Sequence, residues 1–176
     1  MKILLISLIK DFLRADRPGK PKGTIFLRFP SLALANIAAL TTKEDKIIVI
    51  DEQISPINFN INVDLVAISV NTSVAPRAYE IADNFRKRKI PVVFGGLHPS
   101  LIPKESLEHA DAIVIGDANG SWEKLVSDFK IGKLKKIYKS NQKASLDNLP
   151  TPKWEIFDKM GYINTNFVEV TRGCSH

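Results

Sequence analysis

Five short runs of apolar residues recur along the chain, and polar or helix-periodic segments separate them. Within each run the apolar residues are nearly continuous rather than alternating, which is typical of strands buried on both faces of a parallel sheet. The runs cover residues 2–8, 46–51, 65–70, 91–94 and 112–115. Because parallel strands need crossover connections between them, the pattern predicts an α/β protein.

The segments between the runs carry helical signals. Residues 32–40 are apolar almost all round and rich in helix formers, which predicts a buried helix that begins after Pro30 and Ser31. A short helix is expected over 104–109, whereas 52–63 shows little helical period. Two further segments place their apolar positions on one helical face; these positions are Val74, Ala78, Ile81, Ala82 and Phe85, and then Trp122, Leu125, Val126 and Phe129.

Together these elements predict a flavodoxin-like, doubly wound parallel sheet of five strands in the order 2-1-3-4-5. In this order the direction of winding reverses between the first and third strands. Ligands of such sheets bind at the carboxyl ends of the strands, beside this switch point. The loops after the first, third, fourth and fifth strands are therefore the candidate site.

Neutral hydrogen-bonding groups and bare backbone dominate these loops. The sequence Asn-Thr-Ser at 71–73 follows the third strand, the pair Gly95-Gly96 follows the fourth, and Gly116-Asp117 follows the fifth. The chain has no nucleophile elbow, no phosphate-binding lysine loop and no dinucleotide glycine fingerprint, and neither His98 nor His109 has a nearby cluster of metal ligands in the sequence. Such loops suit a large polar cofactor held by many neutral hydrogen bonds.

Two of these features have a purely structural alternative. Gly95 and Gly96 either let a ligand lie against the backbone or simply make a tight turn. His98 either faces the ligand or holds the loop in place.

The charge and the cysteine content do not alter the prediction of a cofactor-binding α/β domain. The 176 residues carry a formal net charge of +6, with basic residues concentrated at 86–89 and 130–143. This charge allows a nucleic-acid-binding hypothesis, but no aromatic residues interleave with the first cluster, so we do not expect nucleic acid as a partner. We expect a cytoplasmic protein without a membrane partner, because no apolar run is long enough to span a bilayer, no signal peptide is visible and only one cysteine is present.

The residues after about 135 no longer show the alternation of apolar strands and helices. Residues 135–138 are a candidate for a short edge strand, and the segment that follows is polar and punctuated by proline. Trp154, Ile156 and Phe157 are placed to dock against the domain. A strand pattern at 166–170 then runs into a Gly-Cys turn. We therefore expect one domain at 1–139, a linker at 140–165 and the start of a truncated further domain at 166–176.

The order of these motifs resembles the amino-terminal cobalamin-binding domain of cobalamin-dependent radical S-adenosylmethionine enzymes. The motifs are Ile68-Ser69-Val70-Asn71-Thr72-Ser73, Val93-Phe94-Gly95-Gly96-Leu97-His98-Pro99, Ala110-Asp111-Ala112-Ile113-Val114-Ile115-Gly116-Asp117, Pro150-Thr151-Pro152-Lys153-Trp154 and Thr171-Arg172-Gly173-Cys174. The resemblance covers nearly the whole chain. It implies a flavodoxin-like module that binds cobalamin for methyl transfer or a rearrangement in the intact enzyme.

The resemblance also implies the site residues. In that family the corrin lies across the carboxyl edge of the sheet, and its nucleotide tail is buried beside the glycine pair. By position, the implied cofactor-binding residues are Ser69, Asn71, Thr72, Ser73, Gly95, Gly96, Leu97, His98, Gly116 and Asp117. Cys174 would be the first cysteine of the Cys-x3-Cys-x2-Cys motif that binds a four-iron four-sulfur cluster. The cluster and S-adenosylmethionine would be bound only in the intact parent, whose radical domain would be the partner, and the fragment alone would not be catalytic.

The chain departs from related cobalamin domains in two places. Domains of the methionine-synthase type ligate cobalt through the histidine of Asp-x-His-x-x-Gly, but residues 7–30 contain no histidine. Where Gly-Glu-x-Glu often follows the fifth strand, this chain has Gly116-Asp117-Ala118-Asn119. We therefore expect cobalamin without a lower-ligand histidine from the first loop. The alternative hypothesis is a domain that has kept the fold, lost cobalamin and serves as a docking platform for the missing domain.

Overall fold

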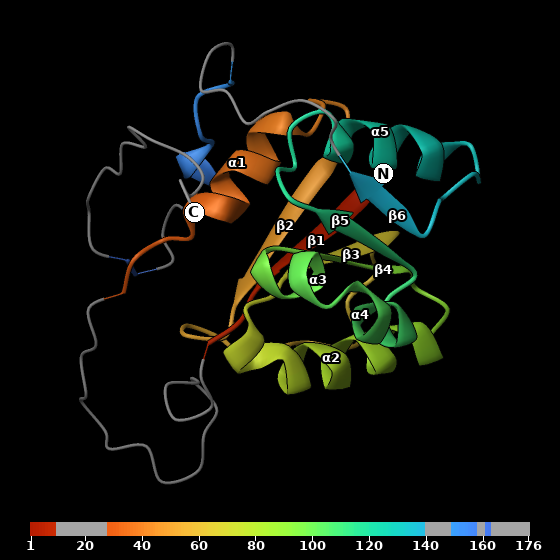
Figure 1. Ribbon diagram of the computed structural model, residues 1–176. Coiled ribbons are helices and arrows are strands. Elements are labelled where there is room, and N and C mark those ends of the chain that lie inside the picture. Colours follow the sequence, from red (N-terminus) through yellow and green to blue (C-terminus); the bar gives the residue numbers. More distant parts are fainter. Residues whose placement is uncertain (10–27, 140–148, 158–160, 163–176) are drawn as a thin grey trace, which may run out of the picture.

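The strands of the protein run parallel in one sheet (Figure 1). The computed structural model describes residues 1–9, 28–139, 149–157 and 161–162. Within these ranges the sheet has six strands in the order β2-β1-β3-β4-β5-β6. The strands are β1 (Lys2–Ser7), β2 (Lys46–Asp51), β3 (Leu65–Ser69), β4 (Val92–Gly95), β5 (Ala112–Ile115) and β6 (Ile137–Lys139).

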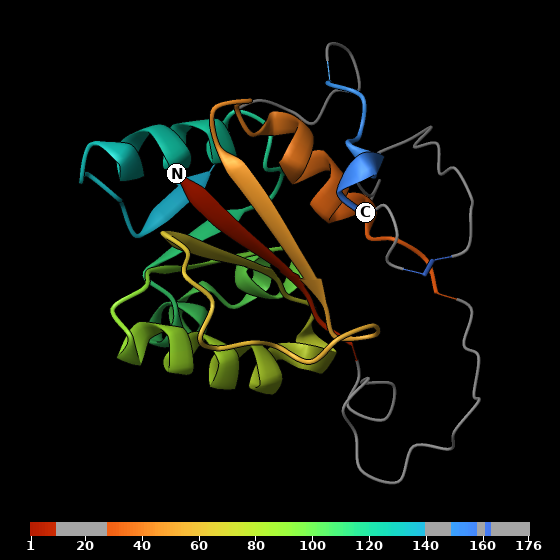
Figure 2. The same ribbon diagram turned by 180° about the vertical axis from the view of Figure 1, so that it is seen from behind.

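Helices cover both faces of the sheet, with α1 and α5 on one face and α2 and α4 on the other (Figures 1 and 2). The helices are α1 (Leu32–Leu40), α2 (Ala75–Lys87), α3 (Leu97–Leu101), α4 (Pro103–His109) and α5 (Ser121–Lys130), with short 3₁₀ turns η2 (Thr72–Val74) and η3 (Trp154–Phe157). Across the described ranges, no helix combines the length and the apolar character that a bilayer crossing needs.

The predicted order of the first five strands is confirmed, but the predicted number of strands is too low by one. The sixth strand, β6, pairs with β5 so that Tyr138 lies opposite Val114. Tyr138 is buried, whereas Ile137 and Lys139 on either side of it are exposed. A three-residue edge strand with one buried side chain leaves too weak an apolar signal to be counted from the sequence.

The stretch after β4 differs from the expected loop, because the chain enters α3 directly after the glycine pair. Gly96 has a φ of 101°, which redirects the chain out of β4. The backbone N–H of His98 then donates to Val70 O at 3.0 Å and fixes the helix start beside the end of β3. Pro99 lies in the first turn, where its missing N–H breaks no helical hydrogen bond. By contrast, 52–63 forms no helix, as the sequence predicts.

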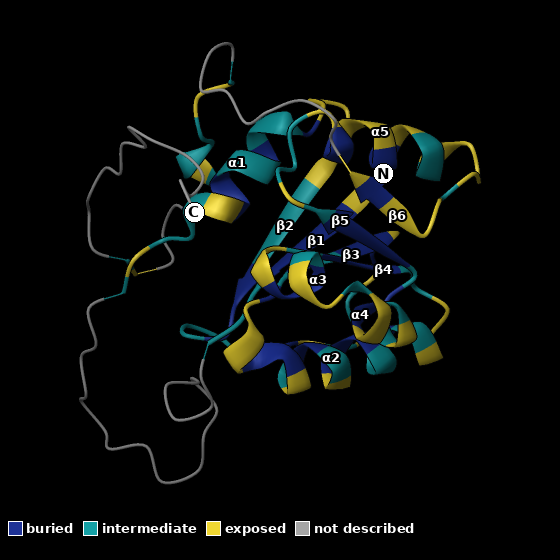
Figure 3. Ribbon diagram, viewed as in Figure 1, coloured by how far each residue is buried: buried dark blue, intermediate teal, exposed yellow. Residues whose placement is uncertain are grey.

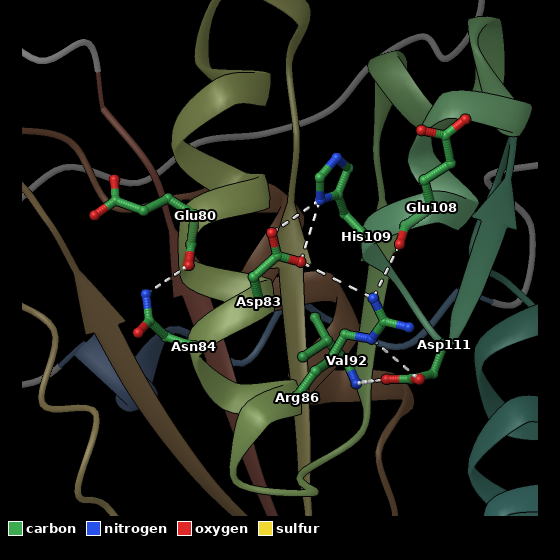
Figure 4. A network of polar contacts seen from close by, with 8 residues as sticks. All are labelled: Glu80, Asp83, Asn84, Arg86, Val92, Glu108, His109 and Asp111. Atoms are coloured by element: carbon green, nitrogen blue, oxygen red, sulfur yellow. Dashed lines mark hydrogen bonds and ion pairs between the residues drawn. The ribbon is translucent and has the colours of Figure 1, made fainter.

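A polar network joins α2 to α4 and to the start of β5 (Figure 4). Arg86 donates through Nε to Asp111 Oδ1 at 3.3 Å and through Nη1 to Glu108 O at 3.0 Å. Nearby, His109 Nδ1 lies 3.1 Å from Asp83 Oδ2. These contacts hold α4 against α2, so we assign this cluster of titratable groups a structural role.

At the amino edge of the sheet, Asp45 is surrounded by donors. Its carboxylate accepts from the amino group of Met1 at 3.0 Å, from Lys130 Nζ at 2.8 Å and from Thr42 Oγ1 at 2.7 Å. Burial alone would raise the pKa of Asp45, but these hydrogen bonds outweigh burial and lower its pKa to about 2. Asp45 is therefore a charged group that stabilises this edge.

The C-terminal segment packs against α1 and β2. Phe157 is buried, and Trp154 and Ile156 pack against the same apolar cluster. The backbone N–H of Lys153 donates to Ala35 O in α1 at 3.1 Å. The prediction that Trp154, Ile156 and Phe157 dock against the domain is therefore confirmed.

Candidate functional site

The two faces of the sheet differ in side-chain size near the carboxyl ends of the strands. On the face toward α2, one row across the sheet consists of Ile6, Ile68, Phe94 and Ile113. On the face toward α1, successive rows consist of Leu5, Ala67, Val93 and Ala112, and then of Ser7, Ser69 and Gly95. The small side chains in β3 and β4 leave a space beneath α1.

This space is a pocket of about 550 Å³, within the range of roughly 300–1,000 Å³ that is usual for small-molecule sites. Ala67, Ser69 and Gly95 line it from the sheet, and α1 lines it from the opposite side. The loop after β5 and Trp122 form a further wall, and residues 149–150 line the pocket from the C-terminal segment. The pocket therefore lies at the carboxyl edge, where the sheet topology places ligands.

Gly95 and Gly96 are glycines for different reasons. A Cβ on Gly96 would lie 2.9 Å from Val70 O, and the φ of 101° also disfavours any other residue, so the fold itself requires glycine there. Gly95 has no such φ, and its Cβ would meet nothing within 4 Å. Because Gly95 lines the pocket, a side chain there would only occupy pocket space. The packing of the protein therefore does not require this glycine.

Ser100 ties together the two glycine loops of the pocket. Its hydroxyl donates to Gly96 O at 2.8 Å and accepts from Gly116 N–H at 2.9 Å. Gly96 and Gly116 both line the pocket, so one side chain fixes the loop after β4 relative to the loop after β5. Sequence reasoning missed Ser100, because a single serine in a short helix has no distinctive pattern.

Half of the predicted cofactor-binding residues line the pocket; these are Ser69, Gly95, Gly96, Gly116 and Asp117. The others lie outside the lining; Asn71, Thr72, Ser73 and Leu97 are exposed at the carboxyl edge, and His98 is buried. Figure 3 shows the exposed surface of α3 at this edge. The predicted ligand Cys174 lies outside the described residues. The cofactor-binding roles of all these residues remain predictions.

The ring of His98 is held by α2 and the turn before it. Its Nε2 lies 2.6 Å from the Tyr79 hydroxyl oxygen, and its Nδ1 lies 3.4 Å from Thr72 Oγ1. Tyr79 also donates to Glu105 at 2.8 Å. Burial, together with this carboxylate, raises the pKa of Tyr79 to about 12. These contacts favour the structural alternative for His98, in which the imidazole anchors α3 to α2.

The helical wall of the pocket was not predicted. Leu32, Leu34, Asn36 and Ile37 of α1 line it. The signal was the apolar character of 32–40 on every side, since a helix that merely covers a sheet needs one apolar face and exposes the other. A helix with apolar residues beyond its contact face indicates a second apolar partner.

A buried carboxylate lies at the β2 end of the same edge. Asp51 accepts from the Tyr162 hydroxyl at 2.6 Å and from Gln53 N–H at 2.9 Å. Burial raises the pKa of Asp51, although these hydrogen bonds and the charge of Arg28 oppose the rise. Burial and the carboxylate likewise raise the pKa of Tyr162. Asp51 thus holds the C-terminal segment to β2 but does not line the pocket.

Two methyltransferases of Chlorobaculum tepidum are similar to this chain. Bacteriochlorophyllide d C-8(2)-methyltransferase is 39% identical, and the alignment covers 81% of this chain and 33% of that protein. Bacteriochlorophyllide d C-12(1)-methyltransferase is 30% identical, and the alignment covers 69% of this chain and 27% of that protein. The chain therefore spans about a third or less of the length of these relatives.

One solved structure is similar at a lower level. The N-terminal domain of the hypothetical protein TM0182 from Thermotoga maritima shares 22% identity with this chain at a TM-score of 0.39. That alignment covers 49% of this chain and 74% of the other. A likeness at this level supports no conclusion.

The family model described as "B12 binding domain" matches residues 24–126. The match covers more than half of the chain and includes α1, the strands β2 to β5 and every predicted cofactor-binding residue of the domain. B12 is cobalamin, the cofactor that the sequence motifs imply. The chain belongs to the family of B12 binding domains.

Proposed function

We propose that this chain is the cobalamin-binding module of a larger radical S-adenosylmethionine methyltransferase, and that the nucleotide tail of cobalamin occupies the pocket under α1. The observation that carries this proposal is the pocket beside Gly95. It lies at the carboxyl edge in a chain of the B12 binding family, and Gly95 is a glycine that neither the packing nor the backbone requires.

The residues around the pocket fit this cofactor. Ser69 and the backbone of the two glycine loops would lie along the nucleotide tail, and Leu34 and Val93 would help to enclose its base. The exposed residues of the carboxyl edge would meet the corrin; these are Asn71, Thr72, Ser73 and Leu97. His98 would act indirectly, because its contacts anchor α3 beside the site.

Cobalamin would supply a cobalt centre that carries a methyl group, while the chain's own residues hold and orient the corrin. Residues 7–30 contain no histidine, so we expect the cobalt to receive no lower ligand from that loop.

The larger enzyme is inferred from the relatives. Both similar proteins are methyltransferases of about three times this chain's aligned length or more. The motif Thr171-Arg172-Gly173-Cys174 supports a cluster-binding domain that begins near Cys174. We propose that catalysis and substrate choice belong to that further domain, and that residues 1–139 supply the bound cofactor.

The experiment is an absorption spectrum of the purified chain after incubation with hydroxocobalamin and desalting. We expect retained corrin bands near one corrin per chain. Gly95→Val should keep the circular-dichroism melting curve and lower cobalamin affinity by roughly tenfold or more, since the added side chain occupies the pocket. A folded, colourless wild-type chain would overturn the proposal and favour the docking-platform alternative. Equal affinity in Gly95→Val would place the tail elsewhere.

A further inference from the structure

The pocket under α1 offers hydrocarbon and very few polar groups. Leu5, Leu34, Val93 and Val114 are buried side chains of its lining. The indole N–H of Trp122 is not available to a ligand, because it donates to Thr41 Oγ1 at 2.9 Å. Among the lining residues that the structure describes, the polar side chains other than Trp122 are Asn36, Ser69 and Asp117.

Within the sheet, the backbone of β3 and β4 does not add polar groups to the deep part of the pocket. Ala67 and Val93 lie opposite each other in the ladder between β3 and β4, and both strands are paired on their other sides as well. Their N–H and C=O groups therefore bond within the sheet. Ser69 and Asp117 lie at or after the ends of their strands, beside the open edge, rather than in the row that contains Leu5 and Val93. A group deep in the pocket meets mainly apolar atoms.

We propose that the pocket selects the lower base of the cofactor, and that it takes an apolar aromatic base such as dimethylbenzimidazole in preference to a purine. This inference rests on the proposed cobalamin binding. An adenine base would bury an amino group and several ring nitrogens, and the single amide of Asn36 cannot satisfy all of them. Each donor or acceptor left without a partner weakens binding. The methyl groups of dimethylbenzimidazole instead gain from contact with apolar side chains.

The experiment compares three corrinoids that differ only in the tail. They are cobalamin, the cobamide with adenine as lower base, and cobinamide, which has no nucleotide tail. Affinities are measured from the corrin absorbance that the intact chain retains at a series of corrinoid concentrations. We expect cobalamin to bind the most tightly, and both the adenine cobamide and cobinamide to bind more weakly by roughly tenfold or more.

A matched pair of variants assigns the preference to the pocket. Val93 and Val92 are neighbours in β4, both almost fully buried, but Val93 lines the pocket and Val92 faces α2. Val93→Thr should lower the ratio of cobalamin affinity to adenine-cobamide affinity by roughly threefold or more. The reason is that it adds to the pocket wall a hydroxyl that can hydrogen-bond to the adenine base. Val92→Thr should leave the ratio unchanged. The ratio is insensitive to the fraction of protein that folds, so a destabilised variant still reports on selectivity.

The outcomes separate this inference from the proposed function. Failure of all three corrinoids to bind would overturn cobalamin binding itself. Equal binding of cobinamide and cobalamin would leave cobalamin binding intact but remove the tail from the pocket, which overturns the inference. Equal binding of the two complete cobamides, or the same change of ratio in Val92→Thr and Val93→Thr, would overturn selection by the pocket wall.

Discussion

The two faces of the central sheet are built from the same strands yet differ in what their side chains do. Toward α2, large side chains such as those of Ile68 and Phe94 are almost fully buried in one apolar cluster. Toward α1, their neighbours Ala67, Ser69 and Gly95 are small and leave the pocket. One face is therefore packed with large side chains, while the other leaves a cavity in which we propose that a ligand binds. Alternation along a strand lets one segment serve both purposes.

Removing a large side chain from the face toward α2, or adding one to the pocket face, should change stability and cobalamin retention the most. Phe85 of α2 is fully buried on the filled face, and Phe85→Ala should lower the free energy of unfolding by about 3–5 kcal/mol. Ala67→Leu on the pocket face should keep stability and abolish cobalamin retention, because Leu fills empty space. Denaturant melts and corrin retention measure both properties. Loss of retention in folded Phe85→Ala, or unchanged retention in Ala67→Leu, would contradict the division between the faces.

The comparison extends to two carboxylates at opposite edges, Asp45 and Asp51. The pKa of Asp45 is lowered from 3.8 to about 2 in the folded state. Its ionised form therefore stabilises the protein above pH 4, and this contribution is lost as the pH falls toward 2. From that shift, Asp45→Asn should lose roughly 2 kcal/mol at neutral pH.

The difference between wild type and Asp45→Asn should vanish in the same acid range. The contribution of Asp51 to stability has the opposite sign. Because its pKa is raised in the folded state, ionised Asp51 lowers the free energy of unfolding once the pH rises above the pKa of Asp in the unfolded chain. Urea melts of wild type and Asp45→Asn across the acid range measure the trend for Asp45. A constant difference at all pH values would show that Asp45 does not act through its charge.

The two adjacent glycines give a finer test of the same comparison. Gly96→Ala should destabilise the protein by more than about 1 kcal/mol, because both its φ and the 2.9 Å approach to Val70 O oppose a side chain. Gly95→Ala should leave stability equal or raise it by up to about 1 kcal/mol. Thermal melts measured side by side provide the check, and equal losses in both variants would remove the argument that Gly95 serves a ligand.

Ser100 should give the smallest effect. Ser100→Ala removes the two hydrogen bonds that join the glycine loops, and we expect cobalamin affinity to fall by roughly threefold to tenfold. Ser100→Thr keeps the hydroxyl and should restore the affinity. A titration followed by corrin absorbance measures both variants, with a thermal melt as control. Failure of threonine to restore binding would argue that the serine acts only through its size.

The sequence predicted the first five strands and their order well, because continuous apolar runs reflect burial within a parallel sheet. It gave 135–138 as a candidate edge strand but did not count it in the sheet, because the single buried Tyr138 of β6 leaves no apolar run. The sequence analysis also missed α3. A glycine pair with a proline three residues later favours a turn, but Pro99 also fits the first turn of a helix.

The candidate site could be predicted only in part. Gly95, Gly96 and Gly116 follow from their places at strand ends, which the topology brings together, whereas Ser69 came only from the family resemblance. The pocket itself arises from the small size of Ala67 relative to its neighbours and from the contact of α1 with distant residues, and neither is visible in the order of residues along the chain. The hydrogen bonds of Ser100 likewise exist only between loops that are remote in sequence.

The docked C-terminal segment contacts both the pocket and α1. Leu149 and Pro150 line the pocket, and Lys153 is hydrogen-bonded to the helix that forms its wall. Thermodynamic reciprocity requires that, if filling the pocket shifts this segment, then pulling or turning the segment must change the affinity of the pocket by the same factor. Under the proposed function, a change in how residues 149–157 pack on α1 would therefore change how tightly a ligand in the pocket is held.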